Sequence, residues 1–71
     1  MRQWLDDFAA ALGTSAPTDA EVEALLALAG VAAHASERTA APVSCWLAAK
    51  AGVAPTEAAE AARRLAGPSD R

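Results

Sequence analysis

The residues best suited to chemistry lie in one short segment, between His34 and Cys45. His34, the only histidine, can exchange a proton near neutral pH. Arg38 can hold a carboxylate or a phosphate through its planar guanidinium, and Glu37 adds an acid beside it. If Pro42 opens a helix, free backbone N–H groups there would add affinity for an anion. We therefore take His34, Glu37, Arg38 and Pro42 as a candidate binding site.

The same residues also have a purely structural interpretation. Arg38 would then bond the last carbonyls of the preceding helix, where the helix dipole favours a cation. Glu37 would pair with a base or stay solvated, and His34 would fill the corner with its hydrogen bonds satisfied. The residue types alone favour this local role, and a binding site at these positions stays open as the less favoured hypothesis.

Catalysis is not expected from this chain. Cys45 and His34 could act as a thiol nucleophile and its base, but the sequence offers neither an acid partner nor a glycine suited to an oxyanion hole. A buried, inert cysteine is the simpler interpretation. One histidine and one cysteine also fall short of a structural zinc set. We predict a protein that is not an enzyme, with no catalytic residues, no cofactor and no metal site.

The composition restricts the class of partner. The 71 residues include six basic and nine acidic side chains, for a net charge of −3, and the basic residues are scattered along the chain. A protein that grips a phosphate backbone concentrates them on one face. No signal-peptide pattern is found, no apolar run approaches the roughly 18 residues of a membrane span, and a single cysteine suits a reducing compartment. We expect a cytoplasmic protein that binds neither nucleic acid nor membranes.

Every strong structural signal in the sequence is helical, and glycines and prolines divide the chain into segments. The second segment is apolar nearly all round, which is typical of a central, buried helix. The prediction is a single all-α domain over residues 1–71, a small four-helix bundle with a central second helix. The expected helices span about residues 3–12, 19–37, 42–51 and 55–66.

The helix ends have recognisable signals. Thr18 and Glu21 form the pattern of a capping box at the start of the second helix. Gly13 and Gly52 are suited to end the first and third helices. Gly30 interrupts the second helix at a cost of about 1 kcal/mol relative to alanine, and we expect it to let another helix or a ligand come close.

Large apolar side chains are few, because alanine fills 22 of the 71 positions. We therefore expect the two Trp and the Phe to supply much of the core, with dimerisation as the remedy if that core is too small. The third helix has a second face of small residues, Cys45, Ala48, Ala49 and Gly52, which permits close packing. The residues assigned to inward faces are Trp4, Leu5, Phe8, Leu12, Val22, Leu25, Leu26, Ala29, Ala32, Ala33, Val43, Trp46, Leu47, Ala51, Ala58, Ala61, Ala62 and Leu65, with Leu28 and Val31 widening the second face.

The segment "LLALAGVAAHASERTAAPVSCWLAAKAGV" resembles the centre of a short, all-helical bacterial domain family of unknown function. Members of that family occur alone and also appended to molybdenum-cofactor guanylyltransferase-like nucleotidyltransferases. The family pattern has an N-terminal Trp-Leu helix, a "LLDLARDVAH" helix, an "ERPAAP" junction and an aromatic-plus-leucine helix ending in Ala-Gly. These features correspond to Trp4-Leu5, Leu25–His34, Glu37–Pro42, Trp46-Leu47 and Ala51-Gly52.

The chain departs from that family pattern at four positions. Ala27 and Gly30 replace an Asp and an Arg, Thr39 replaces a Pro, and Trp46 replaces a Phe. The resemblance implies that His34, Glu37, Arg38 and Pro42 belong to one structured feature, and it implies an accessory link to molybdenum-cofactor metabolism. It supplies no reaction.

Three functional hypotheses follow. The first is a non-enzymatic accessory or interaction module with an unidentified protein partner, using the junction between the second and third helices and the small-residue face of the third. The alternative is a small anionic-ligand site formed by His34, Arg38 and the start of the third helix. The third is a homodimer, which exposure of Trp4 or Trp46 would favour.

Overall fold

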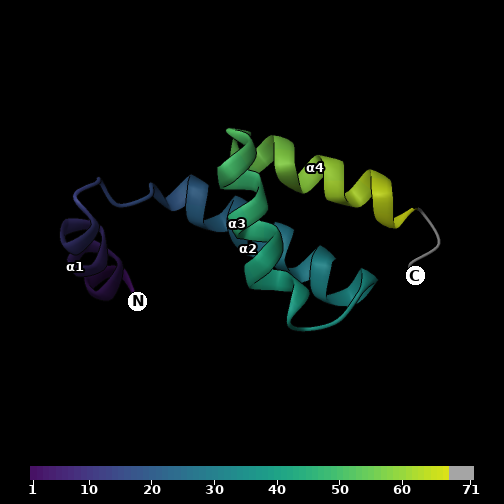
Figure 1. Ribbon diagram of the computed structural model, residues 1–71, viewed down its shortest axis with the longest axis horizontal. Coiled ribbons are helices and arrows are strands. Elements are labelled where there is room, and N and C mark those ends of the chain that lie inside the picture. Colours follow the sequence, from purple (N-terminus) through teal and green to yellow (C-terminus); the bar gives the residue numbers. More distant parts are fainter. Residues whose placement is uncertain (68–71) are drawn as a thin grey trace.

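The computed structural model describes residues 1–67, which form four helices joined by short loops and contain no strand (Figure 1). The predicted all-α fold is confirmed, with α4 at the predicted bounds. The second helix ends at Ala35 instead of residue 37, and the third begins at Ala40, so Pro42 is its third residue. The helices are α1 (Arg2–Leu12), α2 (Asp19–Ala35), α3 (Ala40–Ala51) and α4 (Pro55–Ala66).

The predicted helix caps are confirmed. Thr18 Oγ1 accepts the Glu21 N–H at 3.1 Å, and Glu21 Oε1 accepts the Thr18 N–H at 2.9 Å, which completes a capping box. Gly13 and Gly52 end α1 and α3 with φ of 76° and 74°, a left-handed conformation that glycine adopts without steric cost. The N-cap of α3, Thr39, makes no side-chain bond.

Helix α2 occupies the centre, packed against both α3 and α4, while α3 and α4 contact each other much less. The core at this junction consists of Leu28, Ala58 and Ala59. Small residues pack around it, including Cys45 and Ala48 of α3. Alanines at the contact let the helices approach closely, because the side chains between two helices set their separation.

The prediction that the large apolar side chains fill the core is wrong for most of them. Trp46 is 60% exposed, although α3 was expected to turn it inward, and Leu65 of α4 is 91% exposed. The physical reason is that α3 presents its small face to α2, and α4 presents Ala58 and Ala59. Other residues expected inside but exposed are Trp4, Phe8, Leu12, Leu26, Val43, Leu47, Ala51 and Ala61.

Gly30 does not serve a close approach. A Cβ atom added there would meet nothing within 4 Å. The expectation that Gly30 admits a neighbouring helix is therefore wrong, because its side of α2 faces open space; the expectation of a ligand there stays a prediction.

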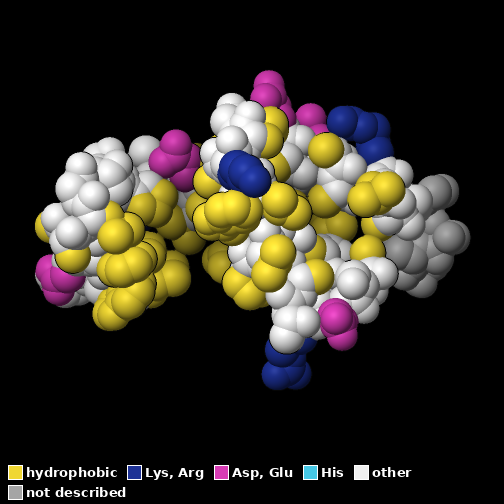
Figure 2. All heavy atoms as spheres, in the orientation of Figure 1, with side chains coloured by type: hydrophobic (Ala, Val, Ile, Leu, Met, Phe, Trp, Pro, Cys, Tyr) yellow, Lys and Arg dark blue, Asp and Glu magenta, His cyan; other side chains and the backbone are white. Residues whose placement is uncertain are grey.

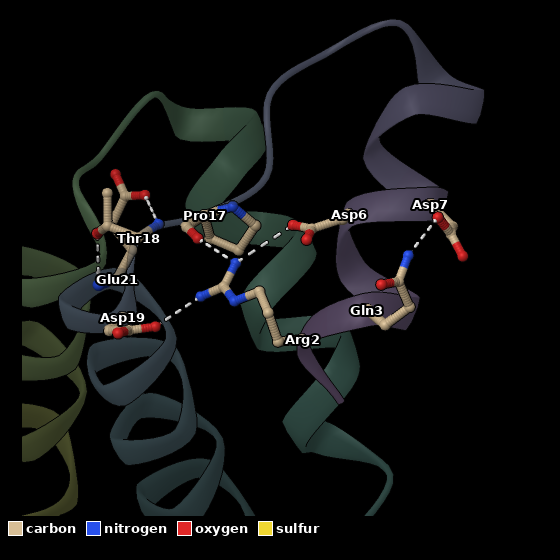
Figure 3. A network of polar contacts seen from close by, with 8 residues as sticks. All are labelled: Arg2, Gln3, Asp6, Asp7, Pro17, Thr18, Asp19 and Glu21. Atoms are coloured by element: carbon tan, nitrogen blue, oxygen red, sulfur yellow. Dashed lines mark hydrogen bonds and ion pairs between the residues drawn. The ribbon is translucent and has the colours of Figure 1, made fainter.

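Helix α1 lies apart from the other three helices (Figure 1), and within residues 1–67 its backbone does not approach theirs. The guanidinium of Arg2 anchors it, donating to the Pro17 carbonyl at 2.7 Å and to Asp19 Oδ1 at 2.8 Å (Figure 3). The Asp6 carboxylate lies 3.7 Å from the same guanidinium. The molecule is consequently elongated, measuring 40 × 21 × 18 Å. No helix in the described part of the chain is long and apolar enough to cross a membrane.

Candidate functional site

The junction between α2 and α3 holds the four residues singled out from the sequence. His34 lies in the last turn of α2, Glu37 and Arg38 lie in the connecting loop, and Pro42 lies in the first turn of α3. All four are exposed. Within residues 1–67, no hydrogen bond or ion pair joins their side chains to other residues. The chain brings the four close in sequence but does not assemble them into a bonded cluster.

The start of α3 offers little to an anion. The Ala40 N–H donates to the Glu37 carbonyl at 2.9 Å, and the Ala41 N–H donates to the Arg38 carbonyl at 3.1 Å. The next residue, Pro42, has no N–H to offer. Anion binding at a helix N-terminus depends on unpaired N–H groups, so the donors expected for a carboxylate or phosphate are already used or missing.

A groove of about 360 Å³ lies next to the junction, and it excludes all four predicted residues. Its polar side chains are Ser36 and Ser44. Apolar residues form the rest of its wall, namely Val31, Ala32, Ala35, Ala40, Ala62, Leu65 and Ala66. Among residues 1–67, the groove therefore has no charged group with which to hold an anionic ligand.

A larger feature, missed by the sequence reasoning, is an apolar surface formed by α1 and α3. Figure 2 shows hydrophobic side chains over both helices. We call this surface the α1–α3 face and define it by Trp4, Phe8, Leu12, Val43, Trp46 and Leu47. Each of these side chains is between 46% and 63% exposed. Contiguous exposed apolar patches on small proteins commonly mark interaction sites.

Between α1 and the rest of the bundle, a groove of about 710 Å³ adjoins the α1–α3 face and shares Phe8 and Leu12 with it. Phe8 and Leu12 line one side, and Leu25, Cys45 and Val53 line the other. Glu21 is the charged side chain among its lining residues. The Cys45 thiol is half-buried, with Sγ 3.9 Å from the Leu25 carbonyl oxygen. The walls suit an apolar occupant.

The aromatic side chains on this face are ordered by their neighbours. The rings of Trp4 and Phe8 stack with centroids 4.8 Å apart, and the ammonium of Lys50 lies 5.1 Å from the centroid of the Trp46 ring. Such contacts restrict rotamers before any partner arrives. They therefore reduce the entropy lost on binding.

One sequence signal could have revealed the face. Large apolar residues occupy one side of α3 and small ones, Cys45 and Ala48, occupy the other. Only one side can pack against α2, so the other faces solvent or a partner unless α1 or α4 covers it. The packed side is the small one, and Val43, Trp46 and Leu47 are left outside.

Together, the fold and these surfaces define a small all-α domain with an exposed apolar face, and its described residues contain no group of three side chains able to hold a metal ion. Residues 1–70 match the family described as Domain of unknown function (DUF6457), and the chain belongs to that family. The resemblance to a domain of unknown function is thereby confirmed. Comparison with curated proteins and with solved structures gave no match.

Proposed function

We propose that this chain is a non-enzymatic accessory module that binds another protein through the α1–α3 face. The supporting observation is the exposure of both tryptophans, Trp4 at 61% and Trp46 at 60%, in a domain whose largest buried side chain is Leu28. Tryptophan is enriched among the residues that dominate protein–protein binding energy.

The exposed part of Trp46 gives an idea of the energy available. A tryptophan side chain buries 150–250 Å² in a core or interface, so covering the 60% that is exposed removes roughly 90–150 Å² from water. At about 25 cal/mol per Å² this contributes about 3 kcal/mol. A few such side chains on one face can support specific association.

The proposal places the binding surface away from the helix junction where sequence reasoning put it. Cys45 and Ala48 of the small-residue face of α3 pack against the core cluster, so the chain itself covers much of that face, and what stays open of these two residues lies along the groove beside α1. The junction residues His34, Glu37 and Arg38 are polar and exposed, whereas the centre of a protein interface is typically apolar and depleted in charge.

A narrower form of the proposal links the chain to molybdenum-cofactor metabolism. It depends on the resemblance to a family whose members also occur appended to molybdenum-cofactor guanylyltransferase-like nucleotidyltransferases. Under this narrower proposal the chain serves a protein of that kind as an accessory. The analogy concerns the domains with which family members occur in one chain, and it assigns no reaction to this chain.

The alternative proposal, an anionic ligand at the α2–α3 junction, retains one favourable feature, the exposed guanidinium of Arg38. It predicts that an anionic metabolite raises the melting temperature and that Arg38→Ala removes the effect. The used N–H groups of Ala40 and Ala41 make this the weaker of the two proposals.

The test of the main proposal is affinity capture from a lysate of the source organism with four baits. These are wild type, Trp46→Glu, Leu26→Glu and the junction variant His34→Ala/Arg38→Ala, each first shown by circular dichroism to be helical. Leu26 is a matched control because it is 61% exposed but lies on α2, outside the face.

We expect a partner that wild type, Leu26→Glu and the junction variant retain and that Trp46→Glu loses. Loss in the junction variant alone would move the binding surface to His34 and Arg38. Absence of a partner from every bait, under conditions that preserve weak complexes, would contradict the proposal.

A further inference from the structure

We propose that the α1–α3 face binds a second copy of this chain, forming a two-fold symmetric dimer. This inference rests on the proposed function, because it names one partner for the same face. It adds the identity of that partner and the contacts that hold the two copies together.

The exposed area of the chain is the first argument. Its accessible surface is 5183 Å². The empirical scaling for folded monomers gives about 4,100 Å² for a mass of 7.2 kDa. The excess, about 1,000 Å², is close to the roughly 800 Å² that each partner buries in a standard-size interface. Pairing two copies through this excess would bring the exposed area per chain down to an ordinary value.

The shape of the molecule locates the excess. The radius of gyration is 12.7 Å, whereas a compact domain of this length has one of about 11 Å. Separation of α1 from the bundle contributes to this extension (Figure 1). It exposes the apolar side of α1, which belongs to the α1–α3 face, and opens the adjoining 710 Å³ groove.

The face is also complementary to itself. Val43, Trp46 and Leu47 form an exposed apolar strip on α3, and the groove between α1 and the bundle lies beside the same helix. In a two-fold dimer a contact of strip with groove occurs twice, because residue i meets residue j in both directions. A single surface thus supplies both halves of the interface.

Charge supports the same arrangement. Lys50 lies beside Trp46, with its ammonium 5.1 Å from the ring centroid, and Glu21 lines the groove. Placing Trp46 of one copy in the groove of the other brings Lys50 toward the opposite charge of Glu21, again twice. Complementary charges at the edge of an interface fix its register and disfavour wrong pairings.

The test is sedimentation equilibrium of the full chain from low to high concentration, on the order of 1–500 μM, with tryptophan emission recorded on the same samples. We expect the mass to rise to twice 7.2 kDa, with a blue shift in emission as the tryptophans are covered. Trp46→Glu should raise the dissociation constant by tenfold or more, about the effect of losing one interface anchor. Leu26→Glu, with the same added charge at 61% exposure, should leave it unchanged.

A charge exchange tests the predicted contact without relying on one variant. Lys50→Glu and Glu21→Lys should each weaken the dimer, and the double variant should recover much of the lost affinity. Circular dichroism on each variant checks that the helices persist, since Glu21 also belongs to the capping box.

Three outcomes would overturn the proposal: a wild-type chain that stays monomeric throughout, Leu26→Glu weakening association as much as Trp46→Glu, or a mass that grows beyond two copies. A monomeric wild type that still captures another protein through Trp46 would refute the dimer and leave the proposed function standing.

Discussion

Replacing Leu28 by alanine should come close to unfolding the protein, whereas the same replacement at Leu26 should cost little. The two leucines lie two positions apart on α2 and differ mainly in environment. Leu28 is 4% exposed within the core cluster, and Leu26 is 61% exposed. Comparing them tests which face of α2 supports the fold.

The expected magnitudes are well separated. Removing a buried leucine side chain typically costs about 2–5 kcal/mol, through lost burial and the cavity left behind. A domain of 71 residues has a total free energy of unfolding of about 4–11 kcal/mol. Leu28→Ala therefore removes a large share of the stability. Leu26→Ala should stay within about 0.5 kcal/mol, as for other surface substitutions.

Urea unfolding followed by circular dichroism measures this difference. It should be run at the lowest practical concentration, so that association does not contribute. With an m-value of about 1 kcal/mol per M, Leu28→Ala should lower the midpoint by about 2 M or more, and Leu26→Ala by less than about 0.5 M. Equal shifts, or a larger shift for Leu26→Ala, would refute the assignment of the core to the Leu28 side of α2.

Three further predictions use matched pairs or single contacts. Gly30→Ala should stabilise the chain by about 0.5–1 kcal/mol, because Gly30 is helical and its Cβ position is open. Gly52→Ala should destabilise it by about 1–2 kcal/mol, because φ there is 74°. Thermal unfolding of both variants measures these changes, and reversed signs would contradict the prediction. Thr18→Ala should lower the free energy of unfolding by about 1 kcal/mol and the melting temperature by about 4–8 °C. Thr39→Ala, at an N-cap without a side-chain bond, should change the melting temperature little. Equal losses in the two variants would argue against the capping box. Arg2→Met should increase amide hydrogen exchange in α1 and leave α2 protected, because the Arg2 contacts with Pro17 and Asp19 anchor α1. Unchanged exchange in α1 would mean that those contacts do not hold α1 in place.

The helices and their caps were predictable because their signals are local. Thr18 and Glu21 satisfy each other's backbone N–H groups whatever the rest of the chain does. Gly13 and Gly52 end helices for an equally local reason. The start of α3 was predicted less accurately, because the helix begins at Ala40, two residues before Pro42.

The direction of α3 was not predictable, because hydropathy does not report which apolar side packs within the same chain. Large residues were expected inside because their burial releases the most free energy. Helix α2 instead accepts Cys45 and Ala48, which leaves Trp46 outside. Apolar residues of an interface and of a core have the same spacing in the sequence, and only the position of the neighbouring helices distinguishes them.

The candidate site illustrates the same limit. His34, Glu37, Arg38 and Pro42 were conspicuous because the single histidine lies close in sequence to an acid, a base and a proline in an alanine-rich chain. Closeness in sequence does not create a cavity, and all four are exposed. The α1–α3 face consists of ordinary core-type residues, so their identities did not show which side of α3 would be left exposed.

The central claim is that Trp46 lies outside the core and is covered only by a partner. Acrylamide quenching of a Trp4→Phe variant, which leaves Trp46 as its sole tryptophan, tests this most directly when a dilute sample is compared with a concentrated one. We expect quenching close to that of a free tryptophan derivative in the dilute sample and clear protection in the concentrated one. A blue-shifted, poorly quenched Trp46 at the lowest concentration would place it in the core of the single chain and contradict this expectation.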